Sequence, residues 1–91
     1  MQIQISPNAF YQQLEDHAVI LNLQSEQYYT LDMVGRDIWE ALSQYGNLDQ
    51  TVTTLLETYQ GVTEKQLQQD IISLITELQQ EGLILVKDSQ A

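Results

Sequence analysis

The sequence predicts an α+β fold of the winged helix-turn-helix class, in which a small antiparallel sheet packs on three helices. Two β-prone runs joined by a short polar turn predict a hairpin over residues 18–31. Three amphipathic segments follow, each with a capping residue before it and a glycine near its end, which is typical of helices. A final apolar run, residues 83–86, predicts a C-terminal strand that could return to the sheet as a wing.

Three strands are expected in the N-terminal third of the chain. Residues 2–6 alternate polar and apolar, and Pro7 ends this first strand because it has no N–H to donate. Residues 18–23 form the second strand, and the polar turn 24–26 leads into the third, Gln27–Leu31. The sequence offers no obvious partner for the far side of this third strand. We therefore expect an open edge that can accept a peptide.

The period of two along a strand predicts which side chains of this hairpin are buried. Tyr29 and Leu31 share one face of the third strand, and we expect this face to join the core. Tyr28 and Thr30 then face solvent or a ligand. Val19, Leu21 and Leu23 share one face of the second strand, and we expect Leu21 and Leu23 to join Tyr29 and Leu31 in the core.

Capping residues and glycines predict the bounds of the three helices. The expected N-caps are Asp32, Asn47 and Thr63, and the closing glycines are Gly46, Gly61 and Gly82. The apolar stripe of the first helix consists of Val34, Ile38, Trp39 and Leu42. Trp39, the only tryptophan, is expected to anchor the core. Gly35 lowers helix stability by about 1 kcal/mol relative to alanine, so we expect another element to approach the helix closely there.

Charge and composition exclude several classes of function. Thirteen acidic residues against three basic ones give a net charge of −10, which repels a phosphate backbone and argues against nucleic acid as a ligand. The chain has no cysteine, so we expect no disulfide and a cytoplasmic location. No apolar run approaches the roughly 18 residues of a membrane span. The length predicts a single domain, residues 1–91.

We find no pattern that indicates catalysis, a metal or a cofactor. His17 is the only histidine, which excludes a multi-histidine metal site. The glycines never cluster as they do in a phosphate-binding loop. Asp37 and Glu40 lie one helical turn apart beside Arg36, a pattern that usually reflects solvation and weak pairing. We therefore expect a binding protein without a cofactor, not an enzyme.

Three segments resemble the PqqD family, whose members recognise ribosomally made, modified peptides. They are Val19–Leu23, Tyr28–Leu42 with the pattern Tyr-Tyr-Thr-Leu-Asp-x-Val-Gly-x-x-Ile-Trp-Glu-x-Leu, and Asp70–Ile84 with its final Gly-Leu-Ile. The resemblance covers about residues 18–85. This residue pattern is most similar to that of the separate leader-binding subunit of lasso-peptide pathways, which delivers the precursor to a leader peptidase. The alternative is a relative that delivers its peptide to a radical S-adenosylmethionine enzyme.

The resemblance implies that a precursor leader peptide adds an antiparallel strand to the third strand and packs against the third helix. It also implies non-catalytic delivery to a leader peptidase or another maturation enzyme. Main-chain hydrogen bonds would supply affinity, and pockets for alternate side chains would supply specificity. Asp70 would favour basic or donor-bearing leader residues, whereas Ile71 and Leu74 are equally compatible with an ordinary helix core. The implied binding residues are Gln27, Tyr28, Tyr29, Thr30, Leu31, Leu67, Asp70, Ile71 and Leu74.

Other classes share this outline. A winged-helix DNA-binding regulator would have the same fold, but its recognition helix needs basic residues, and the only one in the expected third helix is Lys65. The same helix carries the acidic residues Glu64, Asp70, Glu77 and Glu81. A structural adaptor could bind a folded partner through Tyr28 and the acidic surface, and it should ignore a leader peptide. An open edge could also form a homodimer by edge pairing or strand exchange.

Overall fold

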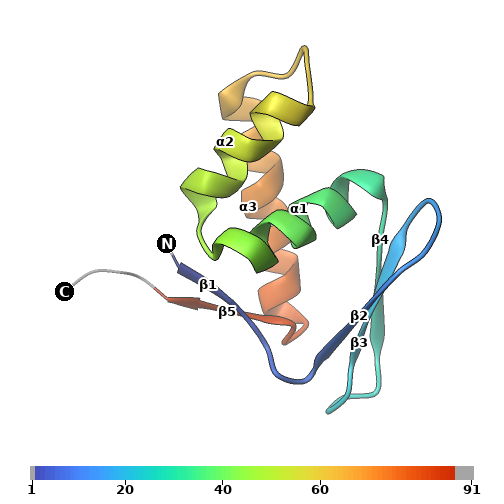
Figure 1. The fold of residues 1–91 in the computed structure, drawn as a ribbon. Coiled ribbons are helices and arrows are strands. Elements are labelled where there is room, and N and C mark those ends of the chain that lie inside the picture. Colours follow the sequence, from blue (N-terminus) through green and yellow to red (C-terminus); the bar gives the residue numbers. More distant parts are fainter. Residues whose placement is uncertain (1, 88–91) are drawn as a thin grey trace.

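The structure, a computed structural model, describes residues 2–87 and places them in three helices and two antiparallel sheets (Figure 1). In chain order the elements are β1 (Gln2–Ile5), β2 (Ala9–Gln13), β3 (Ala18–Asn22), β4 (Tyr28–Leu31), α1 (Met33–Tyr45), α2 (Leu48–Thr58), α3 (Glu64–Gln80) and β5 (Ile84–Lys87). The β2–β3–β4 sheet extends to one side of the helices, and β1 and β5 run beneath them (Figure 1). The α+β class with three helices is confirmed.

The strand β2 was not expected from the sequence. Pro7 does end β1, but the chain turns through Asn8, whose N–H donates to Ser6 Oγ over 3.1 Å, and a new strand begins at Ala9. This strand pairs along its whole length with β3 in the order β2–β3–β4. The prediction of three N-terminal strands was therefore wrong, because a proline that stops one strand does not prevent a second strand from starting after a turn.

The C-terminal strand β5 does not join the hairpin. It pairs antiparallel with β1, with Ile5 opposite Ile84 and Gln2 opposite Lys87. These two strands form a sheet of their own. Just beyond their paired residues, the N–H of Ser6, which follows β1, donates to the carbonyl of Leu83, which precedes β5, over 3.0 Å. The apolar run after α3 is a strand, as expected, but it closes the fold by pairing with the N-terminal strand.

The helix starts are those that the capping residues predict. The side chain of Asp32 accepts from the Gly35 N–H over 2.8 Å, and Asn47 and Thr63 cap α2 and α3 in the same way. Gly46 has a φ of 71°, the left-handed conformation that ends a helix. An ideal Cβ at Gly35 would lie 3.1 Å from Leu31 Cδ2, so the expected close approach to α1 is that of β4.

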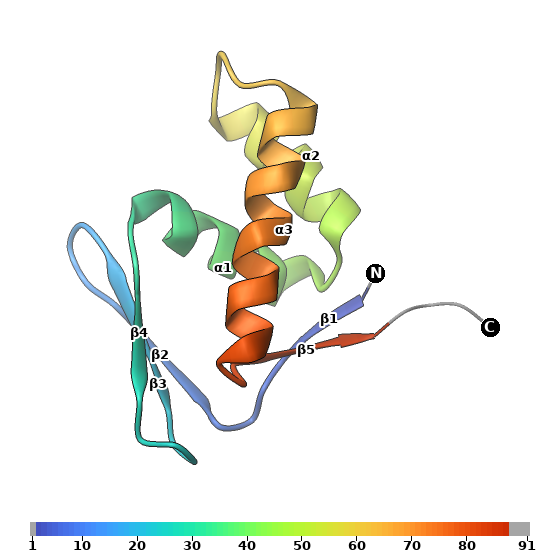
Figure 2. The ribbon, with the colours of Figure 1, turned by 180° about the vertical axis from the view of Figure 1, so that it is seen from behind.

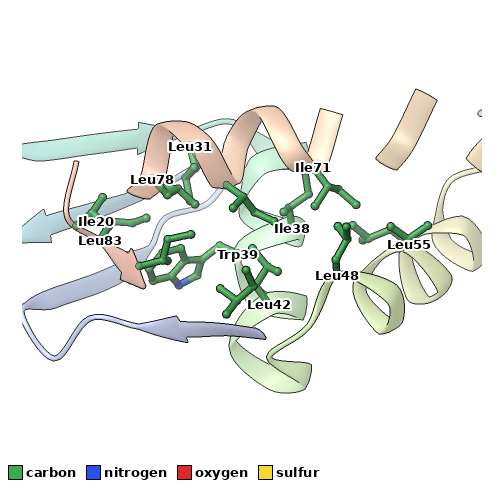
Figure 3. Close-up of a cluster of buried hydrophobic side chains, with 14 of the residues drawn as sticks. Ile20, Leu31, Ile38, Trp39, Leu42, Leu48, Leu55, Ile71, Leu78 and Leu83 are labelled. Carbon is green, nitrogen blue, oxygen red and sulfur yellow. The ribbon is translucent and has the colours of Figure 1, made fainter. Parts of the chain in front are cut away.

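The core lies between the helices and the inner faces of both sheets (Figure 3). Trp39 is 3% exposed and stacks on Tyr11, with ring centroids 5.8 Å apart, which confirms its role as an anchor. Leu31 and Leu78 belong to the same cluster and bring β4 and α3 together (Figure 3). Val34 in the first turn of α1 is 43% exposed, so its expected place in the apolar stripe was wrong.

The expected orientation of β3 was also wrong. Its buried residues are Ala18, Ile20 and Asn22, whereas Leu23 is 55% exposed. The register explains this result, because Ile20 lies opposite Tyr29 and cross-strand partners share one face of a sheet. Val19 and Leu21 are half-buried on the other face. Both faces of this strand are apolar, so alternation alone could not decide which one is buried.

Candidate functional site

The β2–β3–β4 sheet ends in β2 on one side and in β4 on the other. On the β4 side, which adjoins α3, no strand within residues 2–87 pairs with the far side of β4, so this edge is open. The Asn22 N–H donates to the Gln27 carbonyl over 2.8 Å, and the hydrogen-bonding direction then alternates along the ladder. Tyr29 and Leu31 therefore bond to β3. The N–H and C=O groups of Tyr28 and Thr30 point away from β3, toward the open edge.

The turn before β4 is held by the side chain of Asn22. Its Oδ1 accepts from the N–H groups of Gln24 (2.9 Å) and Ser25 (3.2 Å), and its Nδ2 donates to the Glu81 carbonyl over 2.9 Å. Asn22 is 8% exposed, so these bonds satisfy a buried amide. This side chain fixes the start of the edge strand relative to the end of α3.

The helix α3 lies beside the inner face of β4, and its C-terminal half approaches the sheet (Figure 2). The phenol of Tyr29 donates a hydrogen bond to the Glu77 carboxylate. Burial, this hydrogen bond and the charge of Glu77 raise the pKa of Tyr29 to about 12, and Glu81 and Asp32 act in the same direction. The wall beside the edge strand is therefore acidic.

The structure divides the expected third-helix residues into two groups. Leu67 and Ile71 are 3% and 0% exposed, so they belong to the core and offer no surface to a ligand. Leu74 is half-buried and Asp70 is exposed. Asp70, Leu74 and Glu77 follow one another at helical spacing and lie on one stripe of α3. The role of Glu77 could not be predicted from the sequence, because nothing in its neighbourhood marks a contact with Tyr29.

The hairpin residues of the expected site lie together, as the sequence indicates. Tyr28 and Thr30 are exposed, Tyr29 is half-buried and Leu31 is buried. Gln27 precedes β4 and directs its carbonyl toward β3, so it adds nothing to the open edge. The expected face of the strand is confirmed, because Leu31 is in the core and Tyr29 packs against it.

The opposite face of the sheet carries a shallow hollow that the sequence did not predict. It has a volume of about 330 Å³ and is lined by Phe10, Gln12, Val19, Leu21 and Tyr28. We call it the outer hollow. Its lining comes from all the strands of the β2–β3–β4 sheet, so it could be found only with knowledge of β2 and of the orientation of β3.

In the part of the chain that the structure describes, no group of three or more histidine, cysteine or acidic side chains could hold a metal ion. None of the helices found there has the length and apolar character needed to cross a membrane.

This geometry is that of a small domain with an open strand edge beside a helix. The chain belongs to the PqqD family, because the family model described as "Coenzyme PQQ synthesis protein D (PqqD)" matches residues 17–84. The resemblance drawn from the sequence is thereby confirmed. No curated protein sequence matches the chain significantly.

Two solved structures share the fold. The one described as "TbiB1 in Complex with the TbiA(beta) Leader Peptide" has a TM-score of 0.86 and 24% identity, and the alignment covers 94% of this chain and 99% of that one. "Lasso peptide synthetase B1 complexed with the leader peptide" has a TM-score of 0.83 and 22% identity, with 94% and 100% of the two chains covered. At this level of identity the two similarities show the fold.

Proposed function

We propose that this protein is a non-catalytic recognition element that binds the leader peptide of a ribosomally made precursor as an added strand at β4. The observation that carries the proposal is the outward direction of the Tyr28 and Thr30 main-chain groups, with no strand of residues 2–87 beyond them. Membership of the PqqD family supports it. The leader peptides named in the two similar structures support it as well.

The open edge supplies affinity for a peptide backbone. Tyr28 and Thr30 each offer one N–H and one C=O to an added strand, and such groups bond to any extended peptide. A leader that is disordered when free loses conformational entropy on binding, so contacts of its side chains must add to the main-chain bonds. The two faces of the sheet are the surfaces that can provide these contacts.

The wall formed by α3 supplies specificity on the inner face. Side chains of an added strand that alternate toward α3 would meet half-buried Leu74, exposed Asp70, and Glu77 at its bond with Tyr29. This mixture suits two inward side chains separated by one residue, one of them small and apolar and the other basic or able to donate a hydrogen bond. Because the acids are exposed, each ion pair would contribute only about 0–1 kcal/mol and would weaken with salt.

The pathway is proposed from the descriptions of the similar proteins. One solved structure is described as lasso peptide synthetase B1 complexed with the leader peptide, which favours a lasso-peptide pathway and delivery of the bound precursor to a leader peptidase. The family description names coenzyme PQQ synthesis, which favours the alternative of a peptide chaperone for a radical S-adenosylmethionine enzyme. Copurification of this chain with each enzyme in the presence of the precursor distinguishes the two.

The variant Thr30→Pro tests the proposed binding mode. Proline removes one outward N–H, and edge strands tolerate proline where that N–H has no partner within the protein. We expect calorimetry with the leader segment of the precursor encoded in the same gene cluster to give no measurable binding to this variant. The matched control Thr30→Ser keeps the N–H and should bind like the wild type. Undiminished affinity of a folded Thr30→Pro variant would count against strand addition.

A further inference from the structure

The outer face of the β2–β3–β4 sheet carries a row of large side chains that leads to the open edge. Phe10 is opposite Leu21, and Leu21 is opposite Tyr28, so the three form one cross-strand row. Phe10 is 55% exposed and Tyr28 is 71% exposed. Tyr28 ends the row on the β4 side, because β4 is one of the two edge strands of the sheet. A strand added at β4 would place its own side chain next in this row.

We propose that the bound peptide presents an aromatic or aliphatic side chain opposite Tyr28, so that its side chains are recognised on both faces of the sheet. This inference rests on the proposed function, because it requires the peptide strand at β4. Directly opposite residues of neighbouring strands place their side chains on the same face, with Cβ atoms about 5 Å apart. The peptide residue opposite Tyr28 therefore lies on the outer face. The residue next to it faces Tyr29 and α3.

The size of the outer face favours a peptide side chain over a folded partner or a second copy. Three strands about 4.8 Å apart and about 5 residues long present a face of roughly 250 Å². A stable interface buries about 800 Å² on each partner, so this face alone is too small. The hollow of about 330 Å³ lies at the lower end of the range for ligand pockets and suits one or two side chains.

Hydrogen bonds between the peptide backbone and β4 would allow even a weak contact between one peptide side chain and Tyr28 to add to the affinity. Once a peptide strand is held at β4, its outward side chain is tethered next to Tyr28, and contact with the row costs little further entropy. The row continues without interruption from Tyr28 to Leu21 and Phe10. A long apolar side chain on the peptide can therefore extend over the outer hollow.

The charges on the two faces indicate what each face selects. Every side chain that lines the outer hollow is uncharged, although the chain has a net charge of −10. The acids near Tyr29 are Glu77, Glu81 and Asp32, and they act on the inner face. The structure thus favours a peptide whose strand alternates between an apolar outward residue and an inward residue that can donate a hydrogen bond.

A double-mutant cycle tests this inference. The probe is the leader segment of the precursor encoded in the same gene cluster, labelled for fluorescence anisotropy, together with its single-alanine variants. The protein variant is Tyr28→Thr, which removes the ring but keeps a β-branched residue in the strand. The matched control is Leu23→Thr, since Leu23 is 55% exposed but does not line the outer hollow.

We expect one leader position at which alanine weakens binding to the wild type about three- to tenfold, the size of an aromatic contact. The same alanine should change binding to Tyr28→Thr less than about twofold, and Leu23→Thr should behave like the wild type. If the wild type binds the leader but no position couples to Tyr28, this inference is wrong and the proposed function stands. If the wild type binds no leader, the proposed function itself fails. A concentration-dependent dimer that Tyr28→Thr abolishes would assign the outer hollow to a second copy and overturn the inference.

Discussion

The phenol of Tyr29 donates a hydrogen bond to the carboxylate of Glu77, and this contact joins the edge strand β4 to the helix α3. Leu31, two residues further along β4, lies in the same buried cluster as Leu78 of α3. The polar and apolar contacts together hold the open edge at a fixed distance from the helix. The surface that we propose for the leader peptide is therefore largely formed in the free protein, which would limit the entropy cost of association.

Replacement of Tyr29 by phenylalanine tests this link. We expect Tyr29→Phe to lower the free energy of unfolding by about 1 kcal/mol, because one hydrogen bond to a charged partner is lost while Glu77 can be solvated. Urea unfolding followed by the fluorescence of Trp39 measures the change. Tyr28→Phe is the matched control, since Tyr28 is 71% exposed and its loss of a hydroxyl should change stability by less than about 0.5 kcal/mol. An equal loss in both variants contradicts the assigned role of the Glu77 contact.

Stability should fall at alkaline pH. Burial and a hydrogen bond to Glu77 raise the pKa of Tyr29 to about 12, and burial with a bond to Asp37 does the same for Tyr59. A raised pKa means that the folded state favours the protonated phenol. This contribution is fully present below pH 10, the ordinary pKa of tyrosine, and is lost as the pH rises through about 12. Unfolding free energies measured from pH 8 upward should show this decline. The double variant Tyr29→Phe/Tyr59→Phe should decline less steeply, and an unchanged decline would exclude these tyrosines as the cause.

The close contact at Gly35 predicts an unfavourable Gly35→Ala substitution. Alanine favours a helix by about 1 kcal/mol over glycine, but its Cβ would lie 3.1 Å from Leu31 Cδ2. Leu31 is 2% exposed and cannot move aside without disturbing the core. We expect a net loss of about 1 kcal/mol in the free energy of unfolding, together with weaker leader binding, because β4 must shift. The exposed helix position Gln44 provides the control, where alanine should be neutral. A stabilised Gly35→Ala variant would show that α1 and β4 are not tightly packed there.

The buried amide of Asn22 should be hard to replace. Asn22→Ala removes the donor to the Glu81 carbonyl and the acceptor for the turn, so we expect a loss of about 1–3 kcal/mol. Asn22→Asp keeps the acceptor but puts a negative charge at the C-terminal end of α3, where the helix dipole disfavours it. We expect this variant to be destabilised as well, and increasingly so as the pH rises and the new carboxyl ionises. Thermal unfolding at pH 4 and pH 8 checks the order, with Gln24→Ala as the neutral control.

Features that depend on neighbouring residues in the sequence could be predicted well. Each N-cap acts within its own first turn, so Asp32 and Thr63 could be recognised without knowledge of the rest of the fold. The third strand and its open edge were also predicted, because a polar turn separates it from its partner and a helix cap follows at once. These signals are local in the chain.

Features that depend on distant pairing could not be predicted. Phe10 faces the outer hollow and Tyr11 stacks on Trp39, so β2 has one aromatic residue on each face and no clear alternation. Without β2, the two apolar faces of β3 could not be distinguished. Leu67 and Ile71 belong to an apolar helical stripe, and the residues of a ligand groove would have the same spacing as residues of the core. Only the packed structure shows that these two are core residues.

Amide hydrogen exchange with and without the leader peptide tests the open edge of β4 most directly. The N–H groups of Tyr29 and Leu31 point toward β3, so they should exchange slowly in both states. Those of Tyr28 and Thr30 should exchange quickly in the free protein and become strongly protected at saturating peptide. If Tyr28 and Thr30 stay unprotected while the peptide is bound, the peptide does not add a strand at this edge, and the central claim is contradicted.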